Sequence, residues 1–288
     1  METTTTRRQL LERGMTDRQI RAAVERGQLW RLRVGHYARP DVDPAIAAAV
    51  RAGGRLACVS ELRARGVWVL DSAQIHVEVP SNASRLPSSR ARLHWSADRV
   101  VDRAGSGDHV GVLAALGQAS RCLRPLAWLA SVESARHQSL LAASEIPMLR
   151  KLASPRSRRL LNLVDARADS GLETIVRVIA HELGFRVRSQ VRVPGVGRVD
   201  LIVESWIAVE TDGTEFHDVS LSPRDRRRDA QLAARGMTAL RPGYSLIVFD
   251  RAAVARQLIG AVAAHRRVKD SGHLAARARK RLAGLDLS

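Results

Sequence analysis

The length of 288 residues predicts two or three compact units. The hydrophobic content of 45% excludes a disordered chain. Its 47 lysines and arginines outnumber its 29 acidic residues. The resulting formal net charge of +18 favours a polyanionic partner, with nucleic acid first. Cys58 and Cys122 are too few for a disulfide framework or a zinc site, so both are expected to be small core residues.

The sequence has no pattern of a membrane protein. No apolar run approaches the length of a membrane span, and the first ten residues, METTTTRRQL, lack the apolar core of a signal peptide. We therefore expect a cytoplasmic protein with no membrane partner.

Residues 7–40 have the pattern of two helices followed by a β-hairpin. The second helix begins behind Thr16 and ends at Gly27, and two short strands then meet about Gly35. A recognition helix followed by a basic hairpin is typical of a winged helix that docks on DNA. The alternative of a merely solvated basic surface stays open. The candidate DNA-contacting residues here are Arg18, Arg21, Arg31 and Arg33.

The string TDRQIRAAVERGQLWRLRVGHYA is similar to the N-terminal winged-helix domain of AbiEi-type antitoxins. Those proteins are transcriptional repressors of type IV toxin–antitoxin systems. The resemblance implies a winged helix-turn-helix DNA-binding domain over residues 1–45.

Residues 46–168 are predicted to be an antitoxin-like α+β and helical connector. His76 and His94 fall in its two expected strands without a third ligand at a convincing spacing, so no metal site is expected there. The expected elements are helices over 44–51 and 58–65, strands over 75–80 and 91–95, and helices over 109–166.

The stretch 198–217 alternates apolar and polar residues with the period of two that paired strands show. A three-residue turn at 204–206 would place Asp200 directly opposite Glu210, with Asp212 on the same side. Carboxylates so close repel one another unless a cation lies between them, and hard ions prefer such oxygen ligands. The alternative is that these acids only lie on a solvent-exposed face of the hairpin. Apolar residues share that face, which makes this alternative less favoured.

Three motifs in residues 169–262 resemble the domain-of-unknown-function family 559. They are Ser170-Gly-Leu-Glu173; Asp200 with Glu210-Thr211-Asp212-Gly213 and His217; and Asp225-x-x-Arg228-Asp229 with Leu240-Arg241. This family belongs with the very-short-patch mismatch-repair endonucleases in the PD-(D/E)XK nuclease superfamily. The resemblance implies a restriction-endonuclease-like α/β domain with a central mixed sheet over residues 169–265.

The resemblance also implies the residues of an active site. Asp200, Glu210 and Asp212 would bind Mg²⁺ (or Mn²⁺), and His217 would transfer protons near neutral pH. Glu173 is either part of this catalytic cluster or only a capping residue, because Ser-x-x-Glu is a capping box.

The chain departs from the broad superfamily at one position. Asp212 stands where the superfamily has a lysine, so Arg198 or Arg228 would have to supply the positive charge beside the phosphate, and both are candidate DNA contacts. The chain also lacks the cysteine-rich zinc site of the mismatch-repair enzymes. Mismatch recognition therefore does not carry over.

The sequence as a whole predicts an α/β (α+β) protein that binds DNA. The leading hypothesis is a Mg²⁺-dependent DNA endonuclease or nickase that is targeted by the N-terminal winged helix. The alternatives are a DNA-binding regulator or AbiEi-like antitoxin with an inactive nuclease-like domain, and an RNA-binding protein. Residues 266–288 form a basic tail. A homodimer, and a toxin partner for the regulator, are left open.

Overall fold

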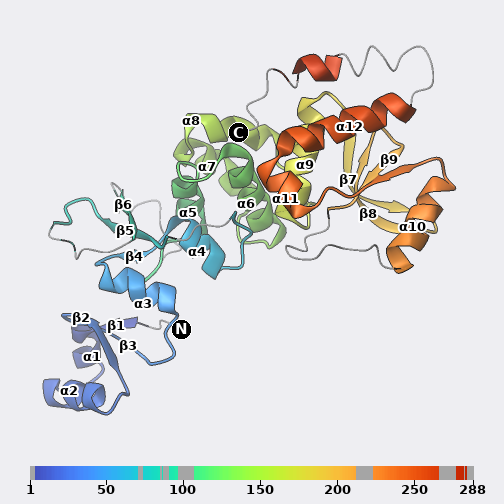
Figure 1. Cartoon of the computed structure of the whole chain (residues 1–288). Coiled ribbons are helices and arrows are strands. Elements are labelled where there is room, and N and C mark those ends of the chain that lie inside the picture. The colour runs from blue at the N-terminus through green and yellow to red at the C-terminus, as the bar shows by residue number, and fades with distance from the viewer. Residues whose placement is uncertain are drawn as a thin grey trace. The chain divides into compact units, whose positions relative to one another are not determined.

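The computed structural model describes residues 4–70, 74–84, 86, 91–96, 107–211, 223–265, 277–281 and 283. The chain divides into two compact units, one of Met1–Ser131 with Gln138–Leu161 and one of Val132–His137 with Asn162–Ser288. Helices and three small sheets confirm the expected mixed α+β class (Figure 1). Within the described ranges, no helix is long and apolar enough to cross a membrane.

The first unit begins with two helices and a three-stranded sheet. Each helix starts with a capping box, in which the side chain of Thr6 or Thr16 accepts a backbone N–H group. Leu10, Ile20 and Tyr37 form the core that these elements share. The elements are β1 (Thr4–Thr6), α1 (Arg7–Glu12), α2 (Asp17–Glu25), β2 (Trp30–Arg33) and β3 (His36–Ala38), with the sheet order β1-β3-β2.

The rest of the first unit packs helices on both faces of a second sheet. The order is β4-β5-β6, with β4 antiparallel and β6 parallel to β5. One face buries Val77 and Val79 against Ala49 of α3 and against Ala52, which follows this helix. The elements are α3 (Pro44–Arg51), β4 (Arg55–Leu56), α4 (Cys58–Ala64), β5 (His76–Pro80), β6 (Arg92–Ser96), α5 (Val112–Ala119), α6 (Pro125–His137), η2 (Ala143–Glu145), α7 (Ile146–Leu152), α8 (Pro155–Arg158) and η3 (Arg159–Leu163). The last residues of α6, from Val132, and of η3, from Asn162, belong to the second unit.

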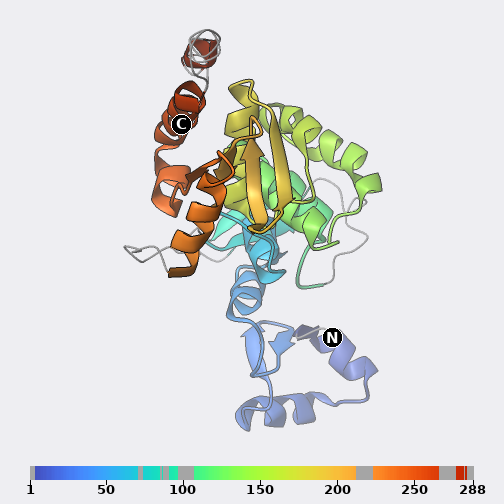
Figure 2. The ribbon, with the colours of Figure 1, turned by 90° about the vertical axis from the view of Figure 1, so that its right-hand side faces the viewer.

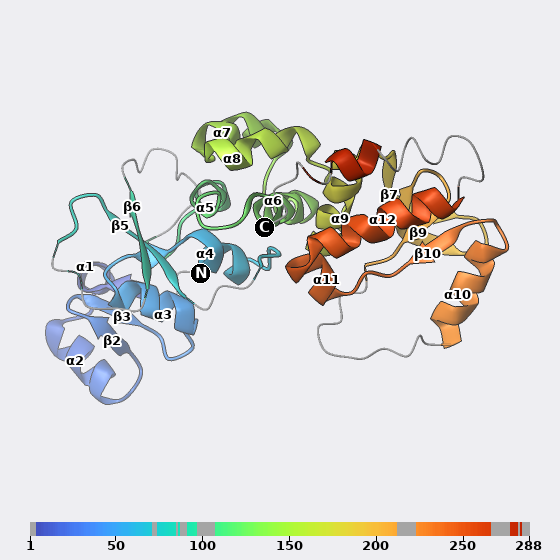
Figure 3. The same ribbon diagram turned by 45° about the horizontal axis from the view of Figure 1, so that its top comes forward.

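The second unit is built on a four-stranded mixed sheet, whose strands are yellow to orange in Figure 2. The strand order is β10-β9-β8-β7, in which only the β9–β10 pair is parallel. Figure 3 shows α9 and α11 on one side of these strands and α10 on the other. The elements are α9 (Gly171–Glu182), β7 (Val187–Val193), β8 (Gly197–Val203), β9 (Ile207–Val209), α10 (Pro223–Ala233), β10 (Thr238–Leu240), α11 (Tyr244–Phe249) and α12 (Arg251–His265).

The hairpin of β8 and β9 has the predicted register. Val203 pairs with Ile207 across a three-residue turn, where Glu204 and Ser205 have positive φ angles. Both faces of the hairpin are buried, because Ile202 and Ala208 pack against α10 while the alternate residues face the other side of the sheet. The predicted face that holds Asp200 is therefore largely covered.

The stretch 244–249 has a different structure from the one that its own sequence favours. Its sequence YSLIVF favours a strand by β-propensity, yet it forms the helix α11. Gly243 holds the extended N-cap position, and the helix buries Ile247 and Val248 where it packs against α9 and α12. Tertiary packing therefore overrides the local preference.

Candidate functional site

Glu173 lies at the start of α9, behind the N-cap residue Ser170. The Ser170 hydroxyl accepts the Glu173 N–H at 3.2 Å, while the Glu173 carboxylate accepts the Asp169 N–H at 3.3 Å. The Ser170 side chain thus caps the helix, whereas the Glu173 carboxylate binds the Asp169 N–H and not that of Ser170. Gln190 of β7 donates its side-chain amide to the same carboxylate at 2.6 Å. The carboxylate is almost fully buried, with 3% of the residue exposed.

The Glu173 carboxyl has a pKa closer to neutral pH than an ordinary glutamate has. Burial raises its pKa to about 7, the hydrogen bond from Gln190 opposes the rise, and the charge of Asp200 adds to it. Glu173 of α9 and Asp200 of β8 therefore repel each other when both are ionised. An acid with this pKa can gain or lose a proton at physiological pH.

Asp200 is held in place by Thr211 from the opposite arm of the hairpin. One carboxylate oxygen accepts the Thr211 N–H at 2.9 Å and the Thr211 hydroxyl at 3.3 Å. Glu210, the residue before Thr211, is fixed by its N–H to the Leu240 carbonyl of β10 at 3.0 Å. The backbone pairing therefore brings Asp200 to the Glu210–Thr211 segment, as the sequence predicts.

Glu210 contacts two arginines of the second unit. Its carboxylate lies 2.6 Å from the Arg228 guanidinium and 3.5 Å from that of Arg241, which also binds Asp229 at 2.9 Å. Only 6% of Glu210 is exposed. The predicted cation-binding acid is thus charge-neutralised by side chains of the protein itself.

The two arginines predicted to contact DNA beside this site are placed differently. Arg228 is partly buried, paired with Glu210, and donates to the Arg198 carbonyl oxygen. The Arg198 side chain is largely exposed and paired with Asp169. Of the two, Arg228 contacts the predicted acids directly.

Asp212 and His217 lie outside the described residues, so the structure does not place them. The sequence predicts no site role for Gln190 and Arg241, which contact Glu173 and Glu210. Gln190 has a positive φ of 53° within a strand. The residues on either side of it, Ser189 and Val191, pair with Leu201 and Val199, which flank Asp200. An amide within the arginine-rich strand VRSQVRV was the one local signal for Gln190.

The four arginines predicted in the first unit, Arg18, Arg21, Arg31 and Arg33, are all exposed on α2 and β2. Trp30 on the same strand is 44% exposed, and Val34 after it is 81% exposed. A basic surface with exposed apolar side chains is able to reach both the phosphates and the grooves of a nucleic acid.

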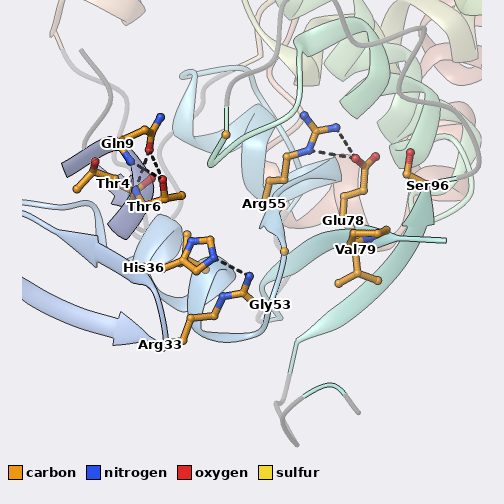
Figure 4. Close-up of a pocket in the computed structure, with 15 residues that line it drawn as sticks. Thr4, Thr6, Gln9, Arg33, His36, Gly53, Arg55, Glu78, Val79 and Ser96 are labelled. Atoms are coloured by element: carbon orange, nitrogen blue, oxygen red, sulfur yellow. Dashed lines mark hydrogen bonds and ion pairs between the residues drawn. The ribbon is translucent and has the colours of Figure 1, made fainter. Parts of the chain in front are cut away.

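A cavity of about 490 Å³ lies beside β1 in the first unit (Figure 4). Its charged groups are already paired: Arg55 lies 2.5 Å from Glu78, and Arg33 lies 2.9 Å from His36. Burial lowers the pKa of His36, and Arg33 adds to that effect, so this imidazole is neutral at pH 7. The cavity brings together none of the residues predicted for catalysis.

A second cluster of ligating side chains lies in the first unit, where the sequence predicts no metal site. In the described part of the chain, Cys58, His76, His94 and Cys122 each offer a ligand atom, and these atoms all lie within 4.8 Å of one another. This cluster could hold a metal ion. The pKa of Cys122 is lowered, first by its hydrogen bond with Cys58, and the same contact raises the pKa of Cys58.

No protein-family model matches the chain, and no curated protein matches it significantly. The structure by itself defines a mixed α+β protein of two compact units. Its function is therefore inferred from the geometry of the acids and arginines described above.

Proposed function

We propose that the protein is a Mg²⁺-dependent (or Mn²⁺-dependent) DNA endonuclease or nickase. In this proposal the second unit is a restriction-endonuclease-like domain related to family 559, and residues 1–45 form a winged helix that targets it to DNA. The observation that carries the proposal is the placement of Asp200, which Thr211 holds through a hydrogen bond and whose charge acts on the buried Glu173.

The donor set fits a hard divalent cation. Carboxylate oxygens are the ligands that Mg²⁺ prefers, and Glu173, whose pKa is raised by burial and by the charge of Asp200, lies close enough to act on that site. Asp200, Glu210 and Asp212 would hold the ion. A bound Mg²⁺ supplies an activated water and stabilises negative charge on the phosphate.

The protein's own residues have separate roles in this proposal. Thr211 fixes the orientation of Asp200 through two hydrogen bonds. Arg228, which contacts Glu210, replaces the superfamily lysine as the positive charge near the phosphate. His217 transfers a proton to or from the reacting oxygen.

A second candidate function is a DNA-binding regulator or AbiEi-like antitoxin whose nuclease-like half is inactive. The observation that favours it is the pairing of Glu210 with Arg228 and Arg241. Two arginines give this acid the positive charge that a cation would otherwise provide. In that case the hairpin would be structural, and a toxin would be the partner.

We expect the wild-type protein to nick or cut plasmid DNA with Mg²⁺ or Mn²⁺ and to be inactive in EDTA. At sub-saturating metal the rate should rise as the pH passes through about 7, because the ionised form of Glu173 attracts the cation and the protonated form does not. Gel assays of supercoiled plasmid across a pH series measure both effects.

The variant Glu173→Gln is the control for the pH effect. An amide does not titrate, so the rise in rate near pH 7 at sub-saturating metal should be smaller than in the wild type, even if some cutting remains. Wild-type protein that binds DNA tightly but cuts no substrate with either metal would favour the regulator. Cutting that continues in EDTA would exclude the metal-dependent mechanism.

The proposed DNA-binding role of the first unit predicts a salt-dependent contribution to affinity. Replacing the exposed arginines at 18, 21, 31 and 33 by alanine should weaken binding and reduce the slope of log affinity against log salt, by roughly 0.9 for each phosphate that the variant no longer neutralises. Fluorescence anisotropy of labelled duplex DNA at several salt concentrations measures the slope. An unchanged slope would show that α2 and β2 do not contact DNA.

A matched control for that experiment is available in the same segment. Arg8 of α1 pairs with Glu12 at 2.8 Å and is also exposed, so Arg8→Ala removes one positive charge outside the proposed surface. This control should leave the slope close to that of the wild type. A decrease equal to one quarter of that in the four-residue variant would indicate only a general effect of net charge.

A further inference from the structure

The cluster of Cys58, His76, His94 and Cys122 gathers four ligands from distant parts of the first unit. Cys58 is the first residue of α4, His76 and His94 lie on the neighbouring strands β5 and β6, and Cys122 follows α5. We propose that these four side chains bind one zinc ion as a structural site. This inference is independent of the proposed nuclease activity.

The ligand chemistry selects the ion. Two cysteine sulfurs with two imidazole nitrogens form a soft tetrahedral set, which favours zinc, whereas Mg²⁺ requires oxygen ligands. Two thiolates neutralise the charge of a zinc ion, so the complete site carries no net charge. A neutral site suits the burial of Cys58, which is 0% exposed, and of His76, which is 3% exposed.

The backbone at Cys58 is held in a conformation that few residues adopt. Its φ angle is +51°, in the left-handed region that is unfavourable for residues with a Cβ atom. Its N–H donates to the Gln118 side chain at 3.0 Å, and the Gln118 amide donates to Glu78 at 2.6 Å. These hydrogen bonds therefore hold the backbone of Cys58 in place.

His76 is fixed by the residues around the start of α4. Its N–H donates to the Ser60 hydroxyl at 2.9 Å, and its carbonyl accepts the Ala57 N–H at 3.0 Å. Its Nδ1 atom lies 3.0 Å from Nε2 of His94, and that nitrogen lies 4.0 Å from the Cys122 sulfur. The backbone hydrogen bonds therefore fix the position of His76 on β5, from which its imidazole reaches His94.

The position of the cluster shows how a zinc ion would stabilise the first unit. None of the five residues of β6 is buried, and the strand pairs only with β5 among the described strands, so hydrophobic burial contributes little to holding it. A metal bond through His94 would join β6 to α4, β5 and the segment after α5. Four protein ligands complete a tetrahedral shell, which is typical of a structural site rather than a catalytic one.

The first test is the metal content of the purified full-length chain, measured by mass spectrometry of the elements. We expect one zinc per chain in the wild type and loss of zinc in Cys58→Ser and Cys122→Ser. His181→Asn, at an exposed histidine of α9, is the control and should keep the ion. Chelation of the wild type should lower its Tm by about 10 °C and should not change the Tm of the cysteine variants.

A second test does not depend on how well the serine variants fold. Wild-type protein prepared without zinc and titrated with Co²⁺ should show the visible bands of tetrahedral cobalt and a thiolate-to-cobalt charge-transfer band. Cys122→His keeps four ligands, so it should still bind one Co²⁺ but with a weaker charge-transfer band. Octahedral or absent cobalt bands would overturn the proposal, as would a Cys58–Cys122 disulfide in freshly purified wild-type protein.

Discussion

Asp200→Asn should abolish Mg²⁺-dependent cutting while it leaves DNA binding intact or tighter. Asparagine keeps an oxygen that accepts the Thr211 N–H, so the hairpin should keep its shape. The substitution removes a negative charge that would bind the cation, and a cation in such a site contributes several kcal/mol, which is a rate loss of more than about 10²-fold. Plasmid nicking and fluorescence anisotropy measure the two properties on the same preparation.

A control for Asp200→Asn comes from an acid far along the sequence. Asp41 is exposed and pairs with Arg39 at 3.2 Å, so Asp41→Asn makes the same chemical change outside the proposed site. It should cut at the wild-type rate. Cutting that survives in Asp200→Asn at the wild-type rate would point to a contaminating nuclease or to a different active site.

The hairpin could be predicted from the sequence because its strand pairing depends on residues that are close together in the chain. Strand alternation and a three-residue turn determine which residues face one another, and the register of Val203 with Ile207 follows from neighbours alone. The position of Asp200 beside Thr211 follows from that register. The partners of the acids could not be predicted in this way, because Gln190 and Arg241 come from other strands or loops.

The cysteine–histidine cluster shows the opposite case. Its members are spaced by 18 residues between the histidines and 28 between His94 and Cys122, which matches no short zinc motif. Only the parallel pairing of β5 with β6 brings the two histidines together, and only the packing of α4 and α5 brings the cysteines to them. Such pairing depends on the whole fold and leaves no local signal.

The buried ion pair of Glu133 and Arg177 should be a major stabilising contact of the second unit. Glu133 of α6 is fully buried, and its carboxylate accepts the Thr174 hydroxyl at 2.7 Å and the Asp165 N–H at 2.8 Å, in addition to the Arg177 contact. Arg177 of α9 is only 7% exposed. Removal of one partner would leave the other charge buried without compensation.

Arg177→Met should therefore destabilise the protein by about 3 kcal/mol at mildly alkaline pH. Burial already raises the pKa of Glu133 from 4.5 to about 7, against the opposing charge of Arg177. The pKa should rise further when that charge is removed. A folded-state pKa above the unfolded value means that stability is full at low pH and is lost as the pH rises through the folded pKa. The loss in Arg177→Met should thus stay small up to about pH 7, where the wild-type Glu133 ionises, and should grow as the pH rises above that value.

Urea unfolding of the wild type and variants at several pH values measures this effect. The matched control is the double variant Glu133→Leu with Arg177→Met, which removes both charges and should be close to wild-type stability or above it. It should also lack the added pH dependence, because no buried carboxyl remains to titrate at this position. Equal destabilisation of the single variant at acid and alkaline pH would show that poorer packing, and not the unpaired carboxylate, is the cause.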